Sequence, residues 1–232
     1  MDFDLNALPA LLQTALDAKT PLTERSAAPY AQMRYPRLLP LMRFSSRRWR
    51  AEAFGSVFCL STRAMGGRMQ LCTFVCTPNL GTDLPVLLID AMRFGKKRAA
   101  FVEYYDCTAH GAVCGPMQAV FARFRDLPDY AEKPAWYIAS RAPYSLIKGG
   151  ADGARLEAML RETAAAYGEA ALSAQARRPE NLAGLARFAE RMVREGNPSS
   201  ATMSRVLGRA GAETFFRTAV MPVSDRESFF QI

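Results

Sequence analysis

Asp90 is the residue of this 232-residue chain with the clearest chemical potential, because it interrupts an apolar run. Leu87, Leu88 and Ile89 precede it and Met92 follows it. The run predicts a buried strand, where a carboxylate costs several kcal/mol unless it is paired, protonated or bound to a ligand. Burial would raise the pKa of Asp90, so it could remain protonated and act as a general acid. Taken alone, it could equally be a strand-end carboxylate paired with a neighbouring Lys or Arg.

The cysteines and the single histidine predict no metal site. The five cysteines are an odd number and none forms a C-x-x-C pair, so we interpret them as reduced, mostly buried thiols. His110 stands in a predicted loop, where a metal would need distant ligands. The chain also lacks G-x-G-x-x-G, P-loop and G-x-S-x-G motifs, so a tightly bound nucleotide or an elbow-type hydrolase has no support.

A basic segment runs from Arg34 to Arg98. It holds twelve Lys or Arg residues and three acidic residues, which gives a local charge of +9. Such a field favours an acidic protein or a nucleic acid as partner. Zinc-finger spacing, RNP-type aromatics and a basic heptad region are all missing, so nucleic acid is the weaker interpretation. The candidate contact residues are Arg47, Arg48, Lys96 and Lys97.

Two features of the sequence bear on its compartment. No apolar stretch reaches the roughly 20 residues of a membrane span. The N-terminal sequence MDFDLNALPALL has acids where a signal peptide needs bases. We therefore expect a cytoplasmic protein with no membrane partner.

The elements that must position Asp90 alternate from helix to sheet and back to helix. A helix is expected from Leu5 to Ala18, followed by a proline-rich stretch that cannot be regular helix. Glycine-containing turns then separate strands predicted over 49–63, 69–77, 85–93 and 99–105. A helix is predicted over 116–125 and a strand over 136–147. Helical periodicity begins after Asp152, with one helix ending at Gly196.

This order predicts an α+β fold, a single-domain α-β-α sandwich whose central antiparallel sheet is flanked by helices. We expect one domain over residues 1–232, because neither a linker nor an internal repeat interrupts the pattern.

Several blocks of the chain resemble the ferredoxin-dependent bilin reductases. Leu71 to Pro78 followed by Asp83 to Asp90 is similar to that family's strand, proline, strand pattern. Lys133 to Lys148 is similar to its Pro-x-Trp strand, and Arg194 to Val220 to its C-terminal helix, polar loop and helix. The resemblance implies reduction of biliverdin IXα, or of a dihydrobiliverdin, with electrons from reduced ferredoxin and with no tightly bound cofactor. It also favours a monomer.

The resemblance also implies roles for particular residues. Asp90 falls on the catalytic aspartate of the family, and Glu52 on a second carboxylate that one branch uses. Lys148 takes the place of an arginine that holds a bilin propionate, with Arg141 and Arg205 as further cationic candidates.

Two positions depart from the family pattern. Thr73 stands where the four-electron branch has an active-site histidine. Asn197 is followed by Pro198, where many members carry an aspartate. The alternatives to a reductase are a bilin-binding protein without catalysis, a relative of the chlorophyll-catabolite reductases and a basic-surface binding protein. Biliverdin bleaching by reduced ferredoxin, or salt-dependent binding to DNA or RNA, would separate them.

Overall fold

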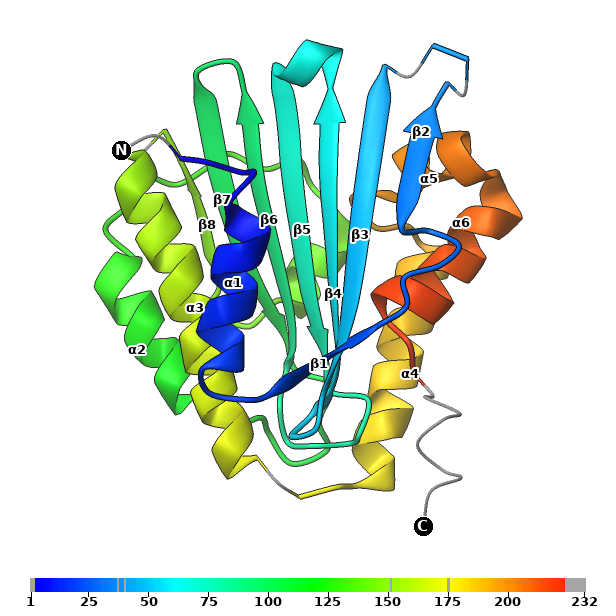
Figure 1. Ribbon diagram of the computed structural model, residues 1–232. Coiled ribbons are helices and arrows are strands. Elements are labelled where there is room, and N and C mark those ends of the chain that lie inside the picture. The colour runs from blue at the N-terminus through cyan, green and yellow to red at the C-terminus, as the bar shows by residue number, and fades with distance from the viewer. Residues whose placement is uncertain (1–2, 37, 40, 151, 175, 224–232) are drawn as a thin grey trace.

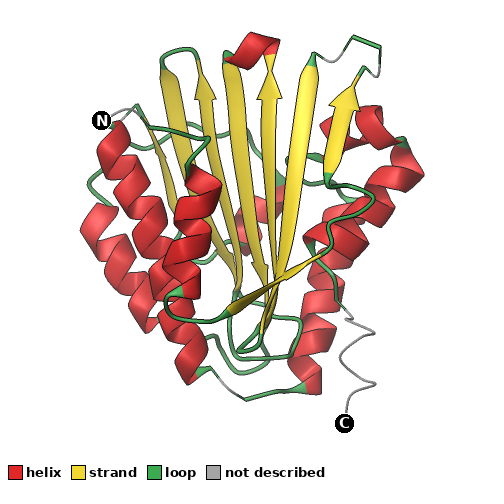
Figure 2. Ribbon diagram, in the orientation of Figure 1, coloured by secondary structure: helices red, strands yellow, loops and turns green. Residues whose placement is uncertain are grey.

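The computed structural model describes residues 3–36, 38–39, 41–150, 152–174 and 176–223, and it shows a sheet with helices on both faces (Figures 1 and 2). Arg37 of the basic segment lies outside these residues. The sheet has eight strands, all paired antiparallel, in the order β1-β3-β4-β5-β6-β7-β8, with β2 also paired to β3. The strands are β1 (Leu22–Arg25), β2 (Gln32–Tyr35), β3 (Met42–Ala51), β4 (Gly55–Ala64), β5 (Met69–Thr77), β6 (Val86–Phe94), β7 (Lys97–Tyr105) and β8 (Leu146–Gly149).

The helices form two layers, which confirms the predicted α-β-α sandwich. One face of the sheet carries α1 (Leu8–Asp17), α2 (Gly115–Phe124) and α3 (Gly153–Ser173). The other carries α4 (Pro179–Arg194), α5 (Ser200–Leu207), α6 (Arg209–Phe215) and a π-helical turn, Phe216–Val220. Among the described residues, no helix is both long and apolar enough to cross a membrane.

Each face of the sheet has its own hydrophobic core. The α1–α3 core includes Leu12, Phe74 and Tyr167, all without exposed surface. The α4–α6 core includes Phe58 and Phe215, whose rings lie 5.6 Å apart in an edge-on arrangement. Because strand side chains alternate between faces, each residue of the sheet belongs to one layer or the other.

The prediction of one long strand over 49–63 is wrong. The chain turns at residues 52–54, so that β3 and β4 form a hairpin. Gly55 has a φ of 140°, and a Cβ there would lie 2.0 Å from the side-chain oxygen of Asn79. The buried Phe54 ring contacts Tyr167 of α3, which draws the turn against the α1–α3 layer.

The prediction of a strand over 136–147 is also wrong for most of its length. Residues Trp136–Ser140 form a 3-10 helix, and the strand β8 begins only at Leu146. The Trp136 indole donates a hydrogen bond to the carbonyl of Gly196 at 2.8 Å, so this segment leaves the sheet to contact the end of α4. The predicted helix over 116–125 is confirmed as α2.

Candidate functional site

Asp90 lies in β6, on the face of the sheet that α4–α6 cover. Its partners across the strands are Thr73 of β5 and Phe101 of β7. Two cavities, of about 280 and 410 Å³, lie on this face, and Asp90 lines both of them. Cavities of a few hundred Å³ with apolar walls and few polar groups are typical of small-molecule sites. Asp90 therefore occupies the position of a central polar group in a ligand site.

The loop between α4 and α5, together with α5 itself, contributes to the helical side of both cavities. Pro198, Ser199 and Met203 line both cavities. Asn197 lines the smaller cavity, but its side-chain amide donates to the carbonyl of Met192 at 3.2 Å and its oxygen accepts from the backbone of Ser199 at 3.0 Å. We conclude that Asn197 holds the loop in shape and that it approaches a ligand only with groups already engaged.

Thr73 is directly beside Asp90. Its hydroxyl donates a hydrogen bond to the Asp90 carboxylate. Burial raises the pKa of Asp90 to about 6, and the bond from Thr73 opposes this rise because it stabilises the ionised form. Asp90 can therefore hold and release a proton close to neutral pH.

A second carboxyl group, Glu103 of β7, lines the larger cavity together with Asp90. Its side chain is 4% exposed and accepts a hydrogen bond from the Arg141 guanidinium. Arg141 also donates two bonds to Glu132, at 2.7 and 2.9 Å. Burial raises the pKa of Glu103 to about 7, against the opposing charge of Arg141. The sequence analysis missed Glu103 and Glu132, although the two-residue turn at Gly95 fixes the register that brings Glu103 near Asp90.

Arg141 was predicted to bind a bilin propionate. Its guanidinium is only 9% exposed and is held by two carboxylates of this chain. A propionate would have to displace one of them. The Arg141 guanidinium is therefore already engaged by Glu103 and Glu132, which line the larger cavity.

The structure does not bring Lys148, which was predicted to bind substrate, to Asp90. Lys148 of β8 pairs with Ala100, which belongs to the α1–α3 core, so its side chain lies on the face opposite Asp90. Its ammonium group donates to the carbonyls of Arg125 and Leu127, each at 2.9 Å, and forms an ion pair with Asp129 at 2.6 Å. All three of its protons are engaged, which explains how a lysine can be buried here.

Glu52 and Arg205 are not brought to Asp90 either. Glu52 is exposed in the β3–β4 turn, and Gly55, where β4 begins after this turn, is five residues along the strand from Leu60, which pairs with Thr73. At the rise of a strand this is about 17 Å from the row that contains Asp90. Arg205 is exposed on α5 and lines neither cavity. The cationic residues at the smaller cavity are instead Arg194 and Arg209.

The four basic residues predicted to contact a partner do not share one surface. Arg47 lies on the α1 face, where it donates to Gln13 and pairs with Glu24, whereas the adjacent strand residue Arg48 points to the other face. Lys96 and Lys97 lie at the turn end of the sheet. The turns between β2 and β3 and between β4 and β5 lie at the same end of the sheet.

We name this turn end the basic rim. The turns are adjacent, because the backbone of Gly95 donates to Arg68 at 3.0 Å and that of Met65 donates to Leu41 at 3.3 Å. The larger cavity reaches the rim through Arg93 and Phe94. Within the described part of the chain, no ion pair involves the rim's cationic side chains, which are Arg43, Arg63, Arg68, Arg93, Lys96 and Lys97.

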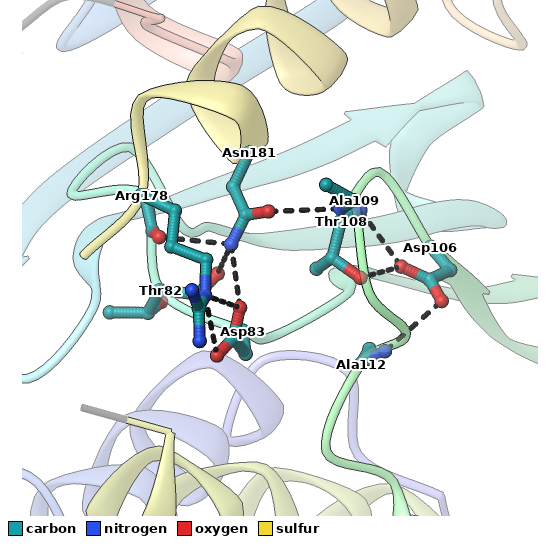
Figure 3. A network of polar contacts seen from close by, with 9 residues as sticks. Thr82, Asp83, Asp106, Thr108, Ala109, Ala112, Arg178 and Asn181 are labelled. Carbon is teal, nitrogen blue, oxygen red and sulfur yellow. Dashed lines mark hydrogen bonds and ion pairs between the residues drawn. The ribbon is translucent and has the colours of Figure 1, made fainter. Parts of the chain in front are cut away.

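The start of α4 is fastened to two loops, and this fixes the helix that carries the cavity loop (Figure 3). Asn181 is 4% exposed and donates to the carbonyl of Gly81 at 3.0 Å and to the carboxylate of Asp83 at 2.8 Å. Its oxygen accepts from the backbone of Ala109 at 3.0 Å. Asp106 in turn accepts from the backbone of Ala112 at 3.1 Å. These bonds hold the two loops and α4 in one arrangement.

The raised pKa of Asp90 predicts how stability depends on pH. The folded protein binds this proton more tightly than the unfolded chain, because the pKa is about 6 instead of 3.8. The contribution is therefore complete below about pH 4 and is lost as pH rises through 6. We expect the unfolding free energy of the wild type, relative to Asp90→Asn, to fall by about 2 kcal/mol from pH 4 to pH 7. Urea unfolding of both proteins would measure this, and a constant difference would contradict it.

The α-β-α sandwich of this chain is similar to the fold of a solved bilin reductase. A matching solved structure is phytochromobilin synthase from tomato in complex with biliverdin, with a TM-score of 0.73. The match covers 96% of this chain and 86% of that chain, at 13% sequence identity. No family model matches the chain, and no curated protein matches it in sequence. The likeness is therefore one of fold, and function has to be argued from the site.

Proposed function

We propose that this protein is an oxidoreductase that reduces biliverdin IXα, or a dihydrobiliverdin, by successive electron and proton transfers. The observation that carries the proposal is Asp90, a half-buried carboxyl group with a raised pKa that lines both cavities on the α4–α6 face. The similarly folded phytochromobilin synthase binds biliverdin, which supports a bilin as the ligand. Asp90 is the central proton donor in this proposal.

The two cavities suit an extended tetrapyrrole with charged edges. Their walls include Phe58, Leu60 and Leu88 on the sheet and Met203 on the helical side. These surfaces would cover the rings, while Asp90 lies where the cavities adjoin. The propionates carry two negative charges and would lie toward the exposed Arg194 and Arg209, in place of the predicted Lys148.

The electrons would come from reduced ferredoxin, an acidic one-electron donor, so no tightly bound cofactor is needed. The basic rim supports this part of the proposal because its charge is complementary to such a donor. Phe94, on the rim, is four residues along β6 from Asp90, a distance of about 13 Å. A donor on the rim would therefore be close to the end of the larger cavity.

An anaerobic absorbance time course tests the proposal. Biliverdin IXα is mixed with the protein, a ferredoxin and a reducing system, and spectra are followed at low and high salt. We expect conversion to a reduced bilin, at a rate that falls at least several-fold with salt because the donor is steered by charge. A control without the protein measures direct reduction by ferredoxin.

The alternative is a bilin-binding protein without catalysis. The lack of a carboxylate at Pro198, in the loop over Asp90, is the observation that favours it. Its result would be a shifted biliverdin spectrum that never bleaches under reducing conditions. A protein that neither shifts nor bleaches biliverdin would refute both functions.

A further inference from the structure

We infer that Glu103 is a second proton donor of this site and that Arg141 is its positioning residue. This inference rests on the proposed function and extends it, because reduction of one double bond needs more protons than Asp90 holds. Glu103 was not among the residues that the sequence or the family resemblance indicated.

The β6–β7 hairpin places Glu103 on the same face as Asp90. Asp90 pairs with Phe101, and Leu88 pairs with Glu103, so the two carboxyl-bearing residues are diagonal neighbours. Diagonal positions of an antiparallel pair are about 7–8 Å apart, within reach of a long side chain. Both residues line the 410 Å³ cavity, which is large enough for one ring system to contact both. A ligand protonated by one acid would therefore be near the other.

The charges around Glu103 do not balance when every carboxyl group is ionised. The Arg141 guanidinium contacts Glu103 and is shared with Glu132, which it binds through two hydrogen bonds. Asp90 adds a third carboxyl group to the same cavity. One positive charge among three carboxylates leaves an excess of negative charge, and burying uncompensated charge is costly. The group of three carboxyls and one guanidinium has a net charge of −2 when all are ionised, and it is neutral only when two of the carboxyl groups hold a proton.

Glu132 is the member that Arg141 binds through two hydrogen bonds. Its side chain is 22% exposed, and both of its oxygens accept from Arg141. Glu103 is 4% exposed, so burial raises its pKa to about 7, with the charges of Asp90 and Glu132 acting in the same direction. The other titratable groups near Glu103 are the phenols of Tyr105 and Tyr137, whose pKa values are also raised. Arg93 lines the same cavity, but it is three residues from Asp90 in β6, so its side chain points to the opposite face of the sheet. The two protons that make the group neutral thus lie on Glu103 and Asp90.

A metal-binding role does not account for the cluster. Across the ranges that the structure describes, no group of three or more His, Cys, Asp or Glu side chains is arranged to hold a metal ion. A purely structural ion pair does not account for it either, because such a pair would not require a third, uncompensated carboxylate at a cavity. A role in supplying protons accounts for the excess of carboxyl groups over positive charge and for their position at the cavity.

Reduction of one double bond of the bilin takes up two electrons and two protons. Two molecules of reduced ferredoxin each give one electron and are oxidised. Asp90 gives one proton and Glu103 the other, which leaves two carboxylates that water reprotonates. With Glu103 unable to donate, the reaction would stop at a singly protonated, one-electron-reduced bilin radical.

The test compares Glu103→Gln with Glu132→Gln in the full chain, using biliverdin IXα and reduced ferredoxin. Glu103→Gln is expected to bind biliverdin within threefold of the wild type, to lose product formation at least 100-fold and to accumulate a radical seen by electron paramagnetic resonance. Glu132→Gln keeps the Glu103 carboxyl group but removes the negative charge that shares Arg141 with it. The pKa of Glu103 should therefore fall. The rate of this variant at pH 6 should persist, while its alkaline limb moves to lower pH.

Each outcome decides between the possibilities. If the wild type reduces biliverdin and Glu103→Gln does so within threefold of its rate, Glu103 is structural and the inference fails, while the proposed function stands. If the wild type leaves biliverdin unchanged, the proposed function fails and the inference with it. Should Glu103→Gln not fold, the alkaline limb of Glu132→Gln decides alone, and an unshifted limb overturns the inference.

Discussion

Asp90→Asn is expected to slow bilin reduction at least 100-fold while biliverdin still binds. General acid catalysis typically contributes between 10² and 10⁴ in rate, and an asparagine has no acidic proton to give. The asparagine side chain has nearly the same volume as that of aspartate, and its oxygen can still accept a hydrogen bond from the hydroxyl of Thr73. Both cavities should therefore keep their shape. Anaerobic absorbance would follow the reduction, and a biliverdin titration would measure the dissociation constant.

Thr73→Val is the matched control for this experiment. It removes the hydrogen bond that stabilises the ionised form of Asp90, so it should raise the pKa of Asp90 further. The variant keeps an acid at the site and should remain active, with its alkaline limb moved to higher pH. An Asp90→Asn protein that reduces biliverdin within threefold of the wild-type rate would remove Asp90 from the mechanism.

The sequence could predict Asp90 because the signal there is local. The apolar run predicts a buried strand, and a carboxyl group within that strand is unfavourable unless it has a partner or a function. The two-residue turn at Gly95 and Lys96 also determines the pairing of β6 with β7. Glu103 could therefore have been found from the same hairpin, by counting along β7 from the residue opposite Asp90.

Lys148 could not be placed from the sequence for the opposite reason. Which face a strand residue occupies depends on where the strand begins and which residue it pairs with. Here the strand begins ten residues later than Trp136, where it was predicted to start, and its partner Ala100 is 48 residues away. The spacing after the tryptophan matched the family pattern, yet the intervening 3-10 helix and loop changed what that spacing means.

Glu52 failed for a related reason. The resemblance matched it to a carboxylate of the family on condition that the hairpin after it is longer here, and the chain turns at residues 52–54, within the strand predicted over 49–63. Gly55 is the residue of the sequence that indicates this turn, since only glycine readily adopts its φ of 140°. The cavities could not be predicted from the sequence. They lie between the sheet and the loop at Pro198, and these elements are more than 100 residues apart and meet only through packing.

Gly184→Ala is expected to destabilise the protein by about 3 kcal/mol, although alanine is the better helix former by about 1 kcal/mol. The reason is the place where α4 crosses the loop after β7. A Cβ at Gly184 would lie 2.0 Å from the carbonyl oxygen of Cys107, a backbone atom that a rotamer change cannot move. The helix or the loop must shift, and Asn181 ties both to the rest of the fold.

Gly115→Ala is the control for this prediction, because it makes the same chemical change at a helical glycine with nothing within 4 Å of the added carbon. It should leave the unfolding free energy within about 1 kcal/mol of the wild type. Urea unfolding at one pH would measure both variants. Since α4 ends in the loop that covers Asp90, Gly184→Ala should also weaken biliverdin binding, which Gly115→Ala should not. Equal stability of the two variants would mean that α4 is not seated on the Cys107 loop as closely as described, and the rigid positioning of the cavity wall would lose its basis.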